Sequence, residues 1–158
     1  MSESAPTLPA VGSIPPNFTL RDQFGADAVL SKFADRTPVA LVFFPLAFTS
    51  VCAGELCELR DNLSVFSAAG VEVLGISVDP MATLRAFGDA EHIPFRLLSD
   101  FWPHGEVATR YGAFDPTRGT AHRATVIVNN SGRVAETFWS PRGEARDLAA
   151  YREALAAL

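Results

Sequence analysis

The chain has 158 residues, of which 48% are hydrophobic and 20% are charged, and its formal net charge at pH 7 is −5. The length predicts a single domain over residues 1–158 with enough chain to build a hydrophobic core. The acidic balance argues against nucleic acid or an anionic membrane surface as the main partner.

The N-terminal segment MSESAPTLPAVG has no basic region followed by an apolar run, so we expect no signal peptide. No stretch approaches the roughly 18 apolar residues that a transmembrane helix needs. We therefore expect a cytoplasmic, reducing setting. Thiols in such a setting are usually redox-active, metal-bound or inert, and permanent disulfides are rare.

The first 45 residues predict an extended lead-in, a hairpin and a buried strand. Residues 1–16 contain four prolines and indicate an extended segment. The segments NFTL and DQFGADAVLS predict two short strands that are joined by a turn around Gly25. The apolar run VALVFF, residues 39–44, predicts a central strand that is buried on both faces and ended by Pro45.

A helix is predicted next, because apolar residues recur at steps of three and four. Thr49 or Ser50 is well placed as its N-cap, and Gly70 is a plausible end. The apolar positions of this helix are Cys52, Leu56, Leu59, Leu63 and Phe66.

The rest of the chain alternates strands with helices. Residues 71–78 predict a strand, and the helix that follows has Pro80 in its first turn and runs through about Glu91. Four further elements are predicted: a short strand over 95–100, a short helix ended by Gly112, a hairpin over 123–139 and an amphipathic helix over 143–158. This order predicts an α/β fold with a mixed central sheet flanked by helices and an N-terminal β-hairpin.

The chain has two cysteines, Cys52 and Cys57. Cys52 follows a strand and opens the predicted helix, where unpaired N–H groups and the helix dipole favour thiolate over thiol. Because the thiolate is the nucleophile, Cys52 is a candidate reactive residue. The alternative is that Cys52 is a small buried hydrophobe in phase with Leu56 on the apolar face of the helix.

The segment PLAFTSVC places Pro45, Thr49 and Cys52 in the spacing P-x3-[ST]-x2-C, which resembles the active-site signature of the peroxiredoxins. The segments VGSIPPNFTLRDQFG, LLSDFWPHGEVATRYGAF and HRATVIVNNSGRV also resemble that family, so the resemblance covers about residues 11–140. FFPLAFTSVC and SDFWPHG are most similar to the AhpE-type peroxiredoxins. The resemblance implies a thioredoxin fold and a thiol-dependent peroxidase in which Cys52 attacks the peroxide.

Four neighbours have roles that the resemblance and simple chemistry suggest together. The Thr49 hydroxyl and the Arg123 guanidinium are donors that can stabilise the charge developing on the departing oxygen. Pro45 has no donor, and we expect it to shape the loop and shield the thiolate from water. Glu55 is expected either to contact Arg123 and tune the thiol or only to suit the positive end of the helix dipole. The alternatives are that Thr49 is only an N-cap and that Arg123 is a surface residue.

Cys57 is a departure from the AhpE type, which generally lacks it. The pattern C-x-x-E-x-C-x-x-R-D over residues 52–61 instead resembles the PrxQ, or bacterioferritin comigratory protein, type. Five helical residues rotate the chain by about 500° and advance it by about 7.5 Å. A disulfide needs Cα atoms within about 7 Å, so Cys52 and Cys57 cannot pair in an intact helix.

We expect Cys57 to resolve the sulfenic acid of Cys52 as an intramolecular disulfide after the start of the helix unwinds. Gly54 suits this step because glycine lowers helix stability by up to about 1 kcal/mol against alanine. The alternative is a one-Cys cycle in which an external thiol resolves Cys52.

The expected reductant is thioredoxin, or a mycoredoxin with a low-molecular-weight thiol, and family resemblance suggests a homodimer. The candidate peroxides are hydrogen peroxide, organic hydroperoxides and peroxynitrite.

No cofactor or metal is expected, since the C-x4-C spacing is poor for a copper or zinc site. A thioredoxin-like oxidoreductase would need C-x-x-C. A non-enzymatic redox sensor that uses the same cysteine is a further alternative.

Overall fold

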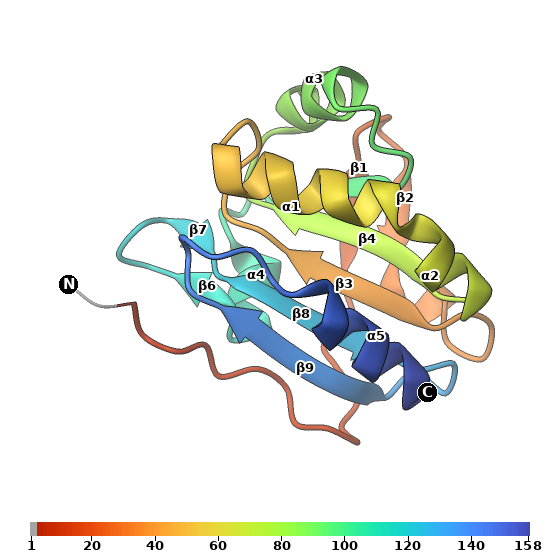
Figure 1. Cartoon of the computed structure of the whole chain (residues 1–158). Helices are drawn as coiled ribbons and strands as arrows, with labels where there is room; N and C mark the ends of the chain where they lie inside the picture. The colour runs from red at the N-terminus through yellow and green to blue at the C-terminus, as the bar shows by residue number, and fades with distance from the viewer. Residues whose placement is uncertain (1–2) are drawn as a thin grey trace.

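A seven-stranded mixed sheet crosses the molecule in the order β2-β1-β5-β4-β3-β8-β9 (Figure 1). The computed structural model describes residues 3–158. At its centre, β3 (Val39–Phe43) pairs in parallel with β4 (Glu72–Ser77) and antiparallel with β8 (Arg123–Val128). All five residues of β3 are buried, because both faces of the sheet are covered. The predicted central strand is therefore confirmed.

Two hairpins form the edges of the sheet, and both agree with the sequence prediction. The first joins β1 (Thr19–Asp22) to β2 (Asp27–Val29) around Gly25, and β1 also pairs with β5 (Arg96–Ser99). The second joins β8 to β9 (Val134–Ser140). In the first hairpin, β1 alternates between exposed and buried residues, so one of its faces packs on the core, whereas β8 of the second hairpin is buried along its whole length.

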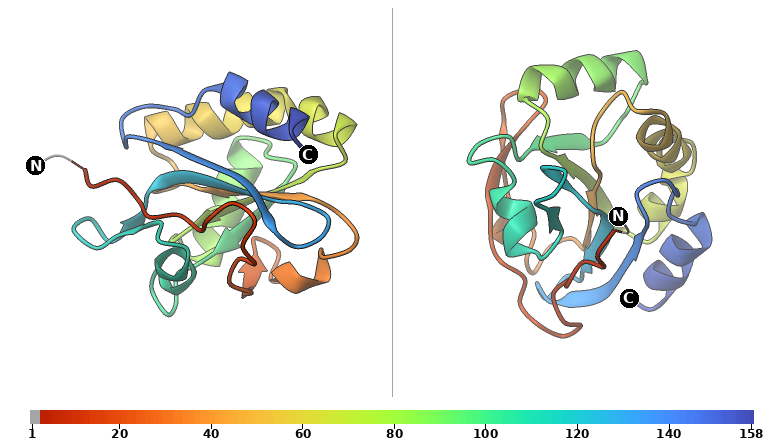
Figure 2. Two further views of the ribbon diagram at one scale, coloured as in Figure 1. Left: turned by 90° about the horizontal axis from the view of Figure 1, so that it is seen from below. Right: turned by 90° about the vertical axis from the view of Figure 1, so that its left-hand side faces the viewer.

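Helices cover both faces of the sheet (Figure 2). One face carries α1 (Ser50–Asp61), α2 (Leu63–Ala68) and α5 (Leu148–Ala156), and the other carries α4 (Glu106–Arg110). The remaining elements are α3 (Met81–Ala90), the 3-10 helix η1 (Leu30–Lys32), and a small sheet of β6 (Phe114–Asp115) and β7 (Thr120–Ala121) that the sequence did not predict.

The helix predicted from residue 50 to Gly70 is in fact two helices. Asn62, with φ −116° and ψ 21°, leaves the helical region and separates α1 from α2. The apolar stripe nevertheless continues across the break, since Leu59 and Phe66 are both buried. Gly70 follows α2 with φ 71°, as expected for the residue that ends a helix.

The C-terminal helix begins five residues later than predicted. Asp147 is its N-cap, and the Asp147 carboxylate accepts a hydrogen bond from the Ala149 backbone N–H at 2.9 Å. Residues 143–147 therefore form part of the loop after β9. A smaller correction concerns Pro80, which is the N-cap of α3 and does not lie in the first turn.

Two hydrophobic clusters lie on opposite faces of the sheet. The cluster beneath α1 includes Leu56, Phe66, Phe87 and Tyr151, so α1, α2, α3 and α5 share one core. The other packs α4 and the N-terminal hairpin on the sheet through residues such as Phe18, Leu74 and Tyr111. Within residues 3–158, no helix is both long and apolar enough to span a membrane.

The N-terminal lead-in lies along the outside of the sheet, as predicted for an extended segment. The Thr7 backbone N–H donates to the Gly112 carbonyl, and the Gly12 N–H donates to the Val134 carbonyl. Gly112 has φ 67°, and a Cβ there would lie 1.9 Å from the Thr7 carbonyl oxygen. Glycine is thus required at this crossing, both for the backbone conformation and for the close approach.

Candidate active site

The loop between β3 and α1 is held in place from β4. Pro45 is buried, and the Ala47 backbone N–H donates to the Asp79 carboxylate at 2.9 Å. The Ser77 hydroxyl donates to the same oxygen of Asp79 at 2.6 Å. Phe48 has φ 64°, a conformation that non-glycine residues rarely adopt and that a rigid surround must hold.

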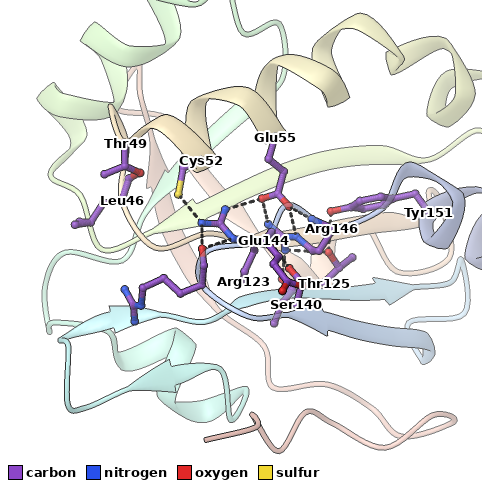
Figure 3. A network of polar contacts seen from close by, with 12 residues as sticks. Leu46, Thr49, Cys52, Glu55, Arg123, Thr125, Ser140, Glu144, Arg146 and Tyr151 are labelled. Carbon is purple, nitrogen blue, oxygen red and sulfur yellow. Dashed lines mark hydrogen bonds and ion pairs between the residues drawn. The ribbon is translucent and has the colours of Figure 1, made fainter. Parts of the chain in front are cut away.

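Thr49 occupies the predicted N-cap position of α1, but its hydroxyl does not cap the helix. The hydroxyl donates to the Leu46 carbonyl at 2.8 Å, within the loop (Figure 3). Its oxygen keeps lone pairs free to accept a hydrogen bond, and Thr49 is exposed. The backbone carbonyl of Thr49 accepts the first bond of the helix, from the Ala53 N–H at 2.8 Å.

Cys52, the third residue of α1, faces Arg123 at the start of β8 (Figure 3). Nη2 of Arg123 donates to Sγ of Cys52 at 3.3 Å. Each of the two residues is 1% exposed. Nε and Nη2 of Arg123 also donate to the Arg142 carbonyl, at 3.2 and 2.8 Å, which fixes the plane of the guanidinium.

Glu55 lies one turn further along α1 and is bonded to two arginines. Its carboxylate accepts from Nη1 of Arg123 at 3.0 Å and from Arg146 through the backbone N–H and two guanidinium nitrogens, Nε and Nη2, at 2.6 to 2.9 Å. Burial raises the pKa of Glu55, but the charge and hydrogen bonds of Arg146, together with Arg123, outweigh burial and leave that pKa below its ordinary value. Glu55 is therefore a buried carboxylate that stays ionised.

Arg146 was missed by the sequence interpretation, which placed it in a helix. It is 3% exposed, and its Nη1 donates to the Ala124 carbonyl and to the Thr125 hydroxyl at 2.7 and 3.0 Å. The Thr125 hydroxyl is also 2.9 Å from the Tyr151 hydroxyl. Arg146 thus links the loop after β9 to β8, α1 and α5.

Cys57 does not face Cys52. Its Sγ donates to a carboxylate oxygen of Glu91, the residue that follows α3, at 3.3 Å. Arg60 donates to the Glu91 backbone carbonyl. Both cysteines are free thiols, and α1 is intact between them.

A second polar cluster lies behind Arg142. The Glu3 carboxylate accepts from the Arg142 backbone N–H at 2.7 Å and lies 2.8 Å from Nδ1 of His122. The Arg142 guanidinium pairs with Asp115 at 3.0 Å. Possible metal-ligand atoms of Glu3, Asp115 and His122 lie within 4.8 Å of one another. Each of these side chains already has a partner in the protein, and the positive charge of Arg142 is unfavourable to a bound cation.

Of the residues predicted for the site, Cys52, Glu55 and Arg123 are in direct contact. Pro45 and Thr49 lie on the loop that leads into α1, and Cys57 lies apart, beside Glu91. Arg142 and Arg146 are the two residues that the structure adds.

A mixed sheet between helices, with a cysteine at a helix start facing a buried arginine, is the arrangement of a thioredoxin-fold thiol peroxidase. The AhpC/TSA family model matches residues 11–137. The chain therefore belongs to the AhpC/TSA family of peroxiredoxins and is a thiol-dependent peroxidase, which reduces a peroxide and is itself reduced by a thiol.

Known proteins of this family resemble the chain over most of its length. Alkyl hydroperoxide reductase E of Mycobacterium tuberculosis is 44% identical over 148 residues, which are 94% of this chain and 97% of the relative. Chloroplastic peroxiredoxin Q of Triticum aestivum is 40% identical over 124 residues, 78% of this chain and 56% of the relative. Among solved structures, the peroxidoxin BcpB of M. tuberculosis is 29% identical with a TM-score of 0.79, over 93% of this chain and 94% of that chain.

Proposed function

We propose that Cys52 is the peroxidatic residue. Its thiolate attacks one peroxide oxygen, the O–O bond breaks, the sulfur becomes a sulfenic acid, and the other oxygen leaves as water or an alcohol after taking up a proton. The observation that carries this proposal is the 3.3 Å contact between Sγ of Cys52 and the Arg123 guanidinium. A cation in a buried site stabilises an anionic sulfur more strongly than the same cation would in water, because the surrounding dielectric constant is lower.

Arg123 is proposed to stabilise the charge that moves onto the leaving oxygen, and Thr49 is proposed to orient the peroxide by accepting its hydrogen bond. Arg123 is pre-oriented by the Arg142 carbonyl and Glu55, so little reorganisation is needed when the peroxide binds. Thr49 is exposed and oriented by its bond to Leu46, which leaves its oxygen free to accept from the peroxide. Pro45 shields the sulfur with an apolar ring that offers no donor.

Hydrogen peroxide and organic hydroperoxides are the proposed substrates, with peroxynitrite as a third. Leu46 and Phe48 are 37% and 55% exposed, and both lie on the loop that precedes Cys52. Large apolar side chains beside the reactive thiol suit the alkyl part of an organic hydroperoxide. The name of the mycobacterial relative, alkyl hydroperoxide reductase E, supports the same choice.

Cys57 is proposed to resolve the sulfenic acid as an intramolecular disulfide, which a thioredoxin-like protein then reduces. The double anchoring of Glu55 limits the unwinding to residues 50–54, at the start of α1. Gly54 lies in this segment, and a Cβ there would have no neighbour within 4 Å. Residues 50–54 precede the contacts that anchor Glu55, so they are the segment proposed to unwind.

The one-Cys cycle is the second candidate, in which an external thiol or a mycoredoxin reacts with the sulfenic acid. The anchoring of Glu55 by Arg123 and Arg146 favours it, because the same contacts oppose the unwinding of α1. A redox sensor with the same chemistry would differ in its slow reaction with peroxide and its dedicated partner.

A homodimer in the cytoplasm is proposed as the working form. Phe48, Phe101 and Trp102 are 55%, 47% and 80% exposed, and large exposed apolar side chains are typical of protein interfaces. Both thiols are free, as a cycle driven by a thiol reductant in a reducing compartment requires. Analytical ultracentrifugation of the reduced protein tests this proposal, and a monomer at all micromolar concentrations contradicts it.

Stopped-flow measurement of peroxide reduction tests the role of Cys52. We expect Cys52→Ser to abolish the reaction and Cys57→Ser to leave the first oxidation step unchanged. Intact mass spectrometry after one equivalent of peroxide then separates the two cycles. A mass lower by two hydrogens indicates the intramolecular disulfide, whereas a lasting gain of one oxygen with Cys57 still free indicates the one-Cys cycle.

A further inference from the structure

Glu91 is in contact with α1 at two points. Its carboxylate accepts from Sγ of Cys57 at 3.3 Å, and its backbone carbonyl accepts from the Arg60 guanidinium, on the next turn of α1. Glu91 follows the last residue of α3, so it joins the end of that helix to the second half of α1. The peroxide chemistry proposed for Cys52 does not use this contact.

The charged groups around Cys57 are Glu91, Arg60 and Asp61. Arg60 is paired with Asp61 at 2.9 Å, which leaves the Glu91 carboxylate as the partner of the thiol. Burial, and next the hydrogen bond to Glu91, raise the pKa of the Cys57 thiol above its ordinary value. The resting thiol therefore keeps its proton and needs an acceptor when it reacts.

We propose that Glu91 is the general base of the resolving step, an inference that rests on the proposed role of Cys57. In this step Cys57 sulfur attacks the sulfur of the Cys52 sulfenic acid. The S–O bond breaks and the S–S bond forms. The thiol proton passes to Glu91 and then to the departing hydroxide, so that water is the only other product.

The surrounding contacts keep Glu91 beside Cys57 during this step. Leu56 and Leu59 are 0% and 2% exposed, and Arg60 is bound to the Glu91 carbonyl, so the second half of α1 is anchored to the core and to α3. The start of α1, before the anchored Glu55, is the part proposed to unwind. Cys52 therefore moves to a Cys57 that is already hydrogen-bonded to its base.

The test compares wild type with Glu91→Gln, which keeps the shape of the side chain and the backbone carbonyl that Arg60 binds. Glu58→Gln is the matched control, because Glu58 is exposed on the same helix. Single-turnover reactions with one equivalent of hydrogen peroxide are quenched with acid and followed by intact mass. The first step, oxidation of Cys52, is measured separately by stopped flow.

We expect Glu91→Gln to leave the oxidation of Cys52 unchanged and to slow disulfide formation at pH 7 by at least about 10-fold. The difference in the rate of disulfide formation between wild type and Glu91→Gln should become smaller as the pH rises, because hydroxide from solution then removes the thiol proton. A merely structural role would not give this pH dependence. Glu91→Asp, which keeps a carboxylate, should restore part of the rate.

Two outcomes overturn the proposal in distinguishable ways. If wild type forms the disulfide and Glu91→Gln forms it equally fast or faster at pH 7, Glu91 only holds the thiol protonated, and the inference alone fails. If wild type keeps a sulfenic acid with Cys57 free, the resolving role itself fails, and the role of Glu91 fails with it.

Discussion

Glu55 accepts three hydrogen bonds from Arg146, one from the backbone N–H at 2.6 Å and two from the guanidinium at 2.6 and 2.9 Å. Arg123 contributes one bond to the same carboxylate and directs Nη2 to the sulfur of Cys52. The two arginines and one glutamate together carry one excess positive charge in a buried site. The thiolate proposed for Cys52 would balance that charge, and Arg146 would then act on the sulfur through Glu55.

Replacing Arg146 by methionine should slow the oxidation of Cys52 by at least about 10-fold, because Glu55 would then compete with the sulfur for the charge of Arg123. The free energy of unfolding should fall by about 3–5 kcal/mol, as expected when a buried ion pair loses one partner. Stopped-flow rates and urea unfolding measure the two effects. Arg152→Met is the control, since Arg152 is exposed on α5.

Arg146→Lys separates charge from geometry if the methionine variant does not fold. Lysine keeps the positive charge but cannot reproduce the planar set of donors, so a rate between those of wild type and Arg146→Met is expected. An oxidation rate equal to that of wild type in a folded Arg146→Met protein would contradict the positioning role.

Glu55→Gln should destabilise the protein by about 3–5 kcal/mol at pH 7, because it leaves two buried arginines without their counter-charge. The pKa of Glu55 is lowered from its ordinary value of 4.5: burial raises it, but Arg146 and Arg123 outweigh burial. The ionised carboxylate therefore makes its full contribution to the unfolding free energy above pH 4.5. This contribution is lost as the pH falls through the lowered pKa that Glu55 has in the folded protein.

Urea unfolding of wild type and Glu55→Gln between pH 7 and pH 3 checks this prediction. The difference in unfolding free energy should shrink on the acid side of pH 4.5, where Glu55 takes up its proton in the unfolded chain while its lowered pKa keeps it ionised in the folded protein. The exposed Glu58→Gln variant should stay within about 0.5 kcal/mol of wild type throughout. A difference for Glu55→Gln that stays constant with pH would show that ionisation of Glu55 is not the source of the stability.

The position of Pro45, Thr49 and Cys52 in the fold is the part of the candidate site that the sequence predicts well. Pro45, Thr49 and Cys52 lie in one segment between a buried strand and a helix, so local pattern alone places them together. The strand 39–44 was predictable for the same reason, since a continuous apolar run that a proline ends has few other interpretations. Arg123 was predicted from the resemblance, and the structure shows its contact with the sulfur.

Arg146 and Arg142 were not predicted, because their roles depend on where the last helix begins. Amphipathic periodicity continues from residue 143 and does not locate that start. Asp147, a good N-cap before an apolar run, was the available signal. The break at Asn62 was missed because the apolar stripe passes through it unchanged. The contact between Cys57 and Glu91 joins residues 34 positions apart and needs the packing of α3 on α1.

Thr49→Val should lower the rate of Cys52 oxidation by about 10²-fold, because the hydroxyl oxygen that accepts from the peroxide and orients it is lost. The loss in unfolding free energy should be only about 1 kcal/mol, because the hydroxyl makes a single exposed bond to the Leu46 carbonyl. Thr49→Ser keeps the hydroxyl and should retain most of the rate. Equal rates of Cys52 oxidation in the valine and serine variants would mean that the Thr49 hydroxyl takes no part in the reaction with peroxide.

Glu3→Gln tests whether the N-terminal segment supports the site. The Glu3 carboxylate accepts from the Arg142 backbone N–H, and the Arg142 carbonyl holds the Arg123 guanidinium. Loss of the charge should loosen this loop, lower the unfolding free energy by about 1 kcal/mol and reduce the oxidation rate severalfold. Glu144→Gln, exposed on the same loop, should change neither quantity. An unchanged oxidation rate in a destabilised Glu3→Gln protein would limit Glu3 to a structural role.

Gly54→Ala tests the proposed unwinding of α1 without touching the reactive groups. Gly54 is exposed within the helix, its backbone is not in the left-handed region, and an added Cβ meets nothing within 4 Å. Alanine should therefore stabilise the helix by up to about 1 kcal/mol.

If residues 50–54 must unwind before Cys52 reaches Cys57, that stabilisation is lost in the reacting conformation. An increase of about 1 kcal/mol in the barrier slows disulfide formation by about fivefold, while the oxidation of Cys52, which uses the intact helix, keeps its rate. A stabilised Gly54→Ala protein that forms the disulfide as fast as wild type would mean that the helix opens elsewhere. The anchoring of Glu55 would then have to break, and the two buried arginines would lose their partner in each catalytic cycle.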